Sequence, residues 1–150
     1  MHNSFTIDID APPATVFKWI YEAERNKQWL PNLVDARLVH EEPGHIGNRF
    51  HQVYVENGRR IEMDGIVIAF EQDRHLACEI KGPFDLSVDY RLEDLGGGRT
   101  RVTQHSTLRF RGMFMKLIGT LLGPMMRKMA AKNSESAFGK LKQLAEADKS

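Results

Sequence analysis

Two polar side chains, Gln104 and Ser106, interrupt a strand-like segment over residues 99–110 whose inner positions are otherwise apolar. Because side chains alternate between the two faces of a strand, Gln104 and Ser106 share the face of Val102 and Leu108. An amide or hydroxyl that is buried without a partner costs about 1–3 kcal/mol, which is a large part of the stability of a small domain. These groups therefore either hydrogen-bond within the core or face a cavity that holds water or a ligand.

Three consecutive glycines, Gly96 to Gly98, separate this segment from an alternating segment before it, which predicts a β-hairpin. A three-residue loop sets Tyr90 opposite Gln104 and Val88 opposite Ser106, so a phenol and an amide meet across the ladder. A two-residue loop would misalign every pair. The other pairs that the three-residue loop predicts are Leu92 with Val102, Leu86 with Leu108, and Phe84 with Phe110.

A second hairpin is predicted at Asn57-Gly58, a dipeptide typical of two-residue turns. It places the polar residues Gln52 and Tyr54 on a mostly apolar inner face, as the first hairpin does with Tyr90 and Gln104. The pairs that this turn predicts are Tyr54 with Ile61, Gln52 with Met63, and Phe50 with Gly65.

The sequence does not support metal, acid–base or nucleophilic chemistry on this inner face. No two of the six histidines have metal-ligand spacing on a helix, and by parity His51 and His105 point outward. By the same alternation the carboxylates of the strands point outward, so no pair of carboxylates on the inner face could act as general acid and general base. No general base shares the strand face of Ser106, so we do not expect Ser106 to be a nucleophile. We therefore expect no catalytic residue, no metal and no cofactor.

The composition indicates one domain, residues 1–150, with balanced charge. Lys plus Arg number 21 and Asp plus Glu number 20, so no strong field favours nucleic acid or an anionic membrane. The single cysteine, Cys78, excludes an internal disulfide, and the amino end shows no leader. Because Lys116 and Pro124 interrupt the longest apolar stretch, we expect a cytoplasmic protein without stable membrane insertion.

Apolar spacing predicts the order of the elements. A short strand covers Phe5 to Ile9, and Pro12-Pro13 opens a helix. The stretch KQWLPNL predicts a short, broken helical turn. From Val34 to Phe110 alternation and turn residues predict six strands. The last third is helical, with a bend at Gly123-Pro124.

The stretch IDIDAPPATVFKWIYEAERNKQWLPNL resembles the opening pattern of the polyketide cyclase/dehydrase and lipid-transport family, within the START-like or SRPBCC superfamily. The shared features are an acidic residue and Ala-Pro before the first helix, then Trp29 and Pro31 where the second helix ends. LGGGRTRVTQHSTLRF resembles the final hairpin of that family. The resemblance implies an α+β helix-grip fold: a seven-stranded antiparallel sheet wrapped around a long carboxy-terminal helix, with two short helices after the first strand.

That fold implies an apolar cavity between the sheet and the final helix, and we expect the inner residues of both hairpins to line it. Trp29 either lines the entrance to this cavity or is an ordinary core tryptophan. The expected ligand-binding residues are Trp29, Leu33, Phe50, Gln52, Tyr54, Met63, Phe84, Tyr90, Gln104, Ser106, Leu121 and Met125.

The resemblance and the inner polar residues together predict binding or transport of a small hydrophobic ligand, such as a lipid, a quinone or an aromatic, polyketide-like metabolite. Two alternatives stay open. A polyketide cyclase or dehydratase of this kind would act mainly by holding a flexible chain, for which Tyr54, Tyr90 and Gln104 would suffice. A protein-interaction module would instead use the outer sheet face, which carries the arginines at alternate positions, Arg99, Arg101, Arg109 and Arg111. The sequence does not determine the oligomeric state.

Overall fold

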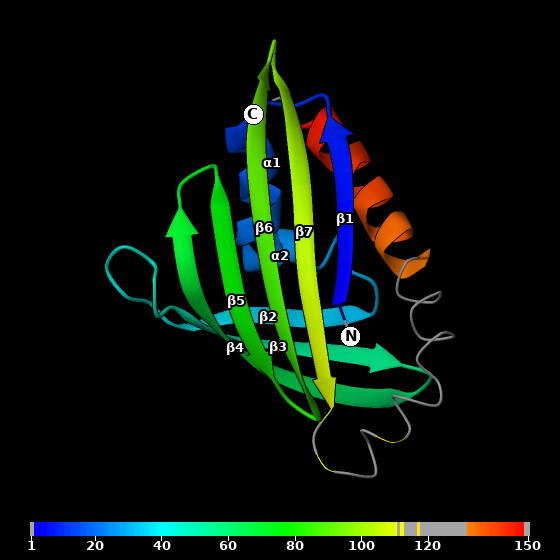
Figure 1. Cartoon of the computed structure of the whole chain (residues 1–150). Helices are drawn as coiled ribbons and strands as arrows, with labels where there is room; N and C mark the ends of the chain where they lie inside the picture. Colours follow the sequence, from blue (N-terminus) through cyan, green and yellow to red (C-terminus); the bar gives the residue numbers. More distant parts are fainter. Residues whose placement is uncertain (1, 111, 113–116, 118–131, 149–150) are drawn as a thin grey trace.

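One antiparallel sheet is the frame of the protein (Figure 1). The computed structural model describes residues 2–110, 112, 117 and 132–148, and within them the strand order is β1-β7-β6-β5-β4-β3-β2. Each strand from β2 to β6 pairs with the next along the chain, and β7 also pairs with β1. The described strands are β1 (His2–Ile9), β2 (Leu33–His40), β3 (Arg49–Glu56), β4 (Arg59–Glu71), β5 (His75–Lys81), β6 (Phe84–Gly96) and β7 (Arg99–Phe110).

Two short helices follow β1, as expected. Helix α1 (Pro13–Tyr21) starts with proline, which lacks the N–H that a first turn leaves unpaired, and buries the predicted face at Val16, Phe17 and Ile20. Helix α2 is Ala23–Asn26, so it ends before the predicted KQWLPNL turn. Asn26, the last residue of α2, connects the two helices, because its Nδ2 donates to the carbonyls of residues 19, 20 and 22 at 2.9–3.0 Å and thereby caps the end of α1.

A carboxy-terminal helix over residues 132–147 lies beside β1 (Figure 1). Its buried residues, Ala137, Phe138, Leu141 and Ala145, recur at helical spacing and form one apolar stripe. The predicted bend at Gly123-Pro124 lies outside the described residues.

Both predicted hairpin registers are confirmed. In β3 and β4, Gln52 pairs with Met63, and in β6 and β7, Tyr90 pairs with Gln104. The predicted three-residue loop is wrong in one detail, because Gly96 already pairs with Arg99 and only two glycines form the turn. A β-bulge between Asp94 and Gly96 absorbs the extra residue, so the two-residue turn produces the same register.

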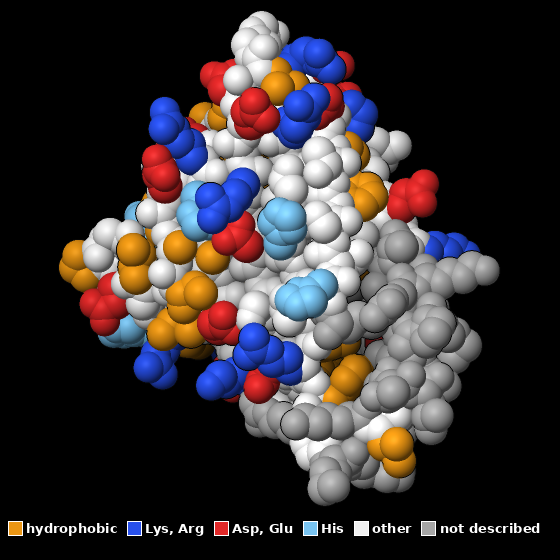
Figure 2. All heavy atoms as spheres, in the orientation of Figure 1, with side chains coloured by type: hydrophobic (Ala, Val, Ile, Leu, Met, Phe, Trp, Pro, Cys, Tyr) orange, Lys and Arg blue, Asp and Glu red, His pale blue; other side chains and the backbone are white. Residues whose placement is uncertain are grey.

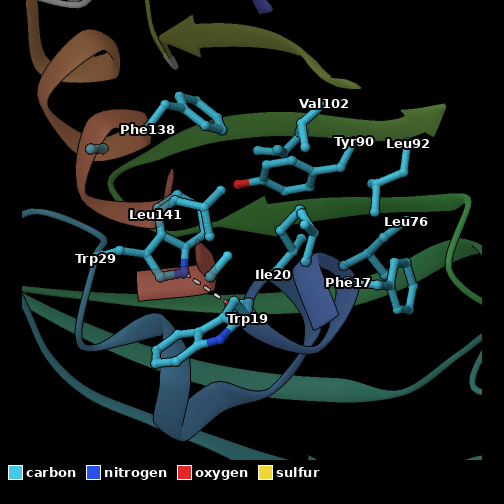
Figure 3. Packing of buried hydrophobic residues seen from close by; sticks show 14 of the residues in the cluster. Phe17, Trp19, Ile20, Trp29, Leu76, Tyr90, Leu92, Val102, Phe138 and Leu141 are labelled. Atoms are coloured by element: carbon cyan, nitrogen blue, oxygen red, sulfur yellow. Dashed lines mark hydrogen bonds between the residues drawn. The ribbon is translucent and has the colours of Figure 1, made fainter. Parts of the chain in front are cut away.

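The core lies between the inner sheet face, α1 and the carboxy-terminal helix (Figure 3). Trp29 is 3% exposed, and its Nε1 donates to the carbonyl of Trp19 at 2.9 Å. Its ring is 5.6 Å from that of Phe138 and 6.5 Å from that of Tyr90, measured between centroids. Trp29 therefore ties the segment after α2 to both the sheet and the final helix.

The Phe50 ring lies directly over Gly65, its partner on β4. A Cβ atom at position 65 would overlap the ring, so this glycine allows Phe50 to lie flat on the sheet.

We predict that Gly65→Ala lowers the free energy of unfolding by about 1–3 kcal/mol, because the added methyl group forces the Phe50 ring away from the sheet. Urea denaturation would measure this loss. In a Phe50→Leu background the same substitution should cost less than half as much, and an equal cost in both backgrounds would contradict the proposed overlap.

Candidate ligand-binding cavity

A cavity of about 590 Å³ lies between the inner face of the sheet and the helices α1 and α2. Its volume is within the range of about 300–1,000 Å³ that is typical of small-molecule sites. The sheet contributes apolar side chains from β3 to β6 because alternate residues of each strand face inward. The apolar wall includes Phe50, Val67, Leu76, Ile80, Leu86 and Val88.

The first polar group of the cavity wall is the predicted pair of Tyr90 and Gln104. The Nε2 of Gln104 donates to the Tyr90 hydroxyl at 3.1 Å. Burial raises the pKa of Tyr90 well above its ordinary value, so the phenol is neutral at physiological pH.

A second polar pair lies on β3. The Tyr54 hydroxyl donates to Gln52 Oε1 at 3.0 Å, and both side chains line the cavity. Burial raises the pKa of Tyr54 to about 12. Both pairs therefore present neutral hydrogen-bonding groups within an apolar wall.

A third polar group, Tyr21, His45 and Asn48, was not among the predicted site residues. The Tyr21 hydroxyl is 3.1 Å from His45 Nδ1, and Asn48 Nδ2 donates to that hydroxyl at 3.0 Å. All three residues line the cavity. The sequence signal for Tyr21 was its place one turn after Phe17 on the apolar face of α1, whereas His45 and Asn48 lie in a loop without periodicity.

The structure brings together only part of the predicted site. Phe50, Gln52, Tyr54, Tyr90 and Gln104 line the cavity. The other described members do not: Trp29, Leu33 and Met63 are buried in the core, and Phe84 and Ser106 are half-buried. Leu121 and Met125 lie outside the described residues.

Trp29 is buried, is hydrogen-bonded to α1 and is not among the described residues that line the cavity. Met63 and Ser106 belong to the inner sheet face by the alternation of their strands and do not line the cavity, so position on that face did not suffice to identify the cavity wall. A side chain on that face also packs against α1 or the final helix, and the one-dimensional pattern does not show where those helices lie.

In the described part of the wall, the charged lining residues lie near α2 and β2. Of these, Glu22 pairs with Arg25, and Glu24 pairs with Lys27 at 2.9 Å. Arg37 is the one Lys or Arg among the described lining residues. A ligand carboxylate would thus meet few cations in this wall.

Cys78 also lines the cavity, and burial raises the pKa of its thiol to about 12. The thiol is therefore protonated and a weak nucleophile at neutral pH. Among the described residues no group of three or more His, Cys, Asp or Glu side chains is arranged to hold a metal ion. The same part of the chain contains no helix that is long and apolar enough to cross a membrane.

The outer sheet face carries mixed charges and histidines (Figure 2). Two of its arginines are paired across to β1: Arg101 with Asp8 at 2.8 Å and Arg99 with Asp10 at 2.9 Å. The alternating arginines thus form part of a mixed, ion-paired surface. Arg111 lies outside the described residues.

A curved antiparallel sheet with a carboxy-terminal helix on its inner side and two short helices after the first strand is the helix-grip arrangement. A family model described as polyketide cyclase/dehydrase and lipid transport matches residues 2–146. The chain belongs to this family, as its sequence motifs predicted. No curated protein matches the sequence.

Solved structures share this fold at low sequence identity. The TTHA0849 protein from Thermus thermophilus is 20% identical, with a TM-score of 0.78 and 100% of each chain covered. A START superfamily protein from Mycobacterium smegmatis is 16% identical, with a TM-score of 0.80 and 97% of each chain covered. The Zhui aromatase/cyclase from Streptomyces sp. R1128 is 16% identical, with a TM-score of 0.77, over 97% of this chain and 93% of that one.

We predict that Gln104→Leu changes the free energy of unfolding by less than about 1 kcal/mol. The Tyr90 hydroxyl loses its amide partner but lies at the wall of a cavity that is large enough to hold water. Thermal and urea denaturation would measure the change. A loss of several kcal/mol would mean that Tyr90 is in a dry core without access to the cavity.

Cys78 should resist alkylation in the folded protein. At pH 8 its raised pKa leaves a thiolate fraction about 1,000-fold smaller than that of an unfolded cysteine. Iodoacetamide labelling followed by mass spectrometry should therefore be far slower in buffer than in urea.

The raised pKa of Cys78 should also make the free energy of unfolding fall as the pH rises from about 9 to about 12, because the thiol of the unfolded chain ionises at lower pH than the buried thiol. Equal labelling rates in buffer and urea would show that Cys78 is not buried in solution.

Proposed function

We propose that this protein binds and carries a small, neutral, hydrophobic ligand in its internal cavity. The observation that carries the proposal is the wall itself, in which apolar side chains surround neutral hydrogen-bonding pairs within about 590 Å³. Such a wall binds by burial of apolar surface and selects by a few directed hydrogen bonds. The family description, which includes lipid transport, supports this function.

Neutral ligands are favoured over anionic ones by the charges on the wall. Among the described residues three glutamates and one arginine line the cavity, and two of these glutamates are paired with cations. A buried carboxylate or sulfonate without a cationic partner is strongly unfavourable. Quinones, aromatic ketones and neutral polyketide-like metabolites therefore fit better than free fatty acids.

A polyketide cyclase or dehydratase is the second candidate, and the Zhui aromatase/cyclase has the same fold. In that case Tyr54, Tyr90 and Gln104 would hold a poly-β-ketone in one folded conformation. Incubation with a linear poly-β-ketone and product analysis by mass spectrometry separates the two functions. Faster formation of one cyclic product, lost in Tyr90→Phe, would favour the enzyme.

We predict that the neutral fluorophore N-phenyl-1-naphthylamine binds at least about 10-fold more tightly than 8-anilinonaphthalene-1-sulfonate, which adds a sulfonate to the same skeleton. Fluorescence titration would measure both dissociation constants. Leu86→Trp should weaken binding of the neutral probe by about 10-fold or more, because Leu86 lines the cavity and a larger ring fills it.

The matched control is Val39→Trp, since Val39 is 55% exposed and does not line the cavity. Thermal melts would verify that both variants fold. Undiminished binding in folded Leu86→Trp would refute binding in this cavity.

A further inference from the structure

Asn48 determines how the hydrogen bonds of the third polar group, Tyr21, His45 and Asn48, are oriented. Its side chain is fully buried, and its Oδ1 accepts from the backbone N–H of Glu42 at 2.7 Å. The orientation of the amide is thereby set, because an amide nitrogen in the Oδ1 position would oppose an N–H donor. The Asn48 NH₂ group must then face Tyr21 and His45.

This orientation determines the direction of the next two hydrogen bonds. Tyr21 accepts from Asn48 Nδ2 at 3.0 Å, which leaves its own hydroxyl hydrogen for His45 Nδ1 at 3.1 Å. Asn48 Nδ2 is also 3.5 Å from the same Nδ1. Both neighbours are thus donors toward Nδ1, so a neutral His45 ring carries its hydrogen on Nε2.

The loop holds the His45 ring in place at some conformational cost. His45 has a φ of 71°, a left-handed conformation that is unfavourable for most residues with side chains. The backbone N–H groups of His45 and Asn48 donate to the carbonyls of Glu42 and His45, each at 3.0 Å. The imidazole also packs on Phe70, with 4.5 Å between ring centroids.

We propose that Tyr21, His45 and Asn48 form a subsite that binds a neutral carbonyl oxygen of the ligand through the Nε2–H of His45. This inference rests on the proposed function and adds the ligand's functional group. His45 lines the cavity and is only half-buried, and its side-chain hydrogen bonds to described residues, from Tyr21 and Asn48, both involve Nδ1, which leaves Nε2 for a ligand. Tyr21 and Asn48 are positioning residues that hold the donor tautomer.

The charges around this subsite select a carbonyl over an anion. Burial raises the pKa of Tyr21, the hydrogen bond from Asn48 opposes that rise, and the nearby charges of Glu41 and Glu22 raise it further. The negative potential of these carboxylates disfavours a ligand carboxylate at the same place.

The subsite is also separate from the polar pair on β3. Asn48 directly precedes β3, and Gln52 and Tyr54 lie four and six residues farther along, which corresponds to about 13–20 Å in an extended strand. A ligand that reaches both would therefore be long, with oxygen atoms far apart.

The test compares 9-fluorenone with fluorene, which has the same carbon skeleton without the carbonyl. Isothermal titration calorimetry should show that the wild type prefers fluorenone by about 5- to 10-fold. His45→Asn should reduce that preference to about 1. Asparagine tolerates positive φ and keeps an acceptor near the Nδ1 position for Tyr21, but it lacks the Nε2 donor.

His105→Asn on the outer face is the matched control and should keep the wild-type preference, because its side chain is exposed. A preference unchanged in His45→Asn would overturn the subsite. Binding of fluorene and fluorenone with equal affinity by the wild type would also overturn it while leaving the proposed function intact. Failure of fluorene, fluorenone and N-phenyl-1-naphthylamine to bind at all would overturn both.

A spectroscopic measurement covers the case in which His45→Asn does not fold. The infrared carbonyl stretch of bound fluorenone should lie at lower wavenumber in the wild type than in Tyr21→Phe, since that variant removes the donor that sets the tautomer of His45. Unchanged frequencies in the two proteins would contradict a directed hydrogen bond from Nε2.

Discussion

The central constraint on this protein is that polar groups on the inner sheet face must be hydrogen-bonded without filling the space between sheet and helices. The bond from Gln104 to Tyr90 meets this requirement for β6 and β7, and the bond from Tyr54 to Gln52 meets it on β3. Each pair satisfies itself while it stays on the wall of the cavity. The wall therefore needs no ligand to complete its hydrogen bonds, because no buried side-chain nitrogen or oxygen of the described residues lacks a partner.

Neutrality of the wall follows from the same constraint. An ionised group on the inner face would need a buried counter-ion, and the charged side chains that the structure describes around the cavity lie instead toward α2, β2 and the outer face. Burial raises the pKa values of Tyr54, Tyr90 and Cys78, which keeps all three uncharged. This arrangement suits recognition of neutral oxygen atoms on an otherwise apolar molecule, whether the ligand is only carried or also folded for a reaction.

The loop before β3 adds a group of a different kind, in which a buried amide directs a phenol and the phenol directs an imidazole. Its geometry depends on the backbone, since His45 adopts a positive φ and Asn48 is enclosed by neighbouring segments. Such a conformation persists only where surrounding contacts hold it. The surrounding contacts here come from α1 and β4, through Tyr21 and Phe70.

The sequence by itself determined the order of elements, both hairpin registers and the family, because alternation and turn residues are local properties that a strand expresses directly. It therefore predicted that Tyr90 faces Gln104 and that Gln52 and Tyr54 share the inner face of one strand, whereas the hydrogen bond between Tyr54 and Gln52 is visible only in the structure. Only the tertiary structure decided which inner residues border the cavity, since Trp29 has the right location in the chain yet packs against the final helix. It also decided the third polar group, because residues brought together from a helix and a loop leave no periodic signal in the chain.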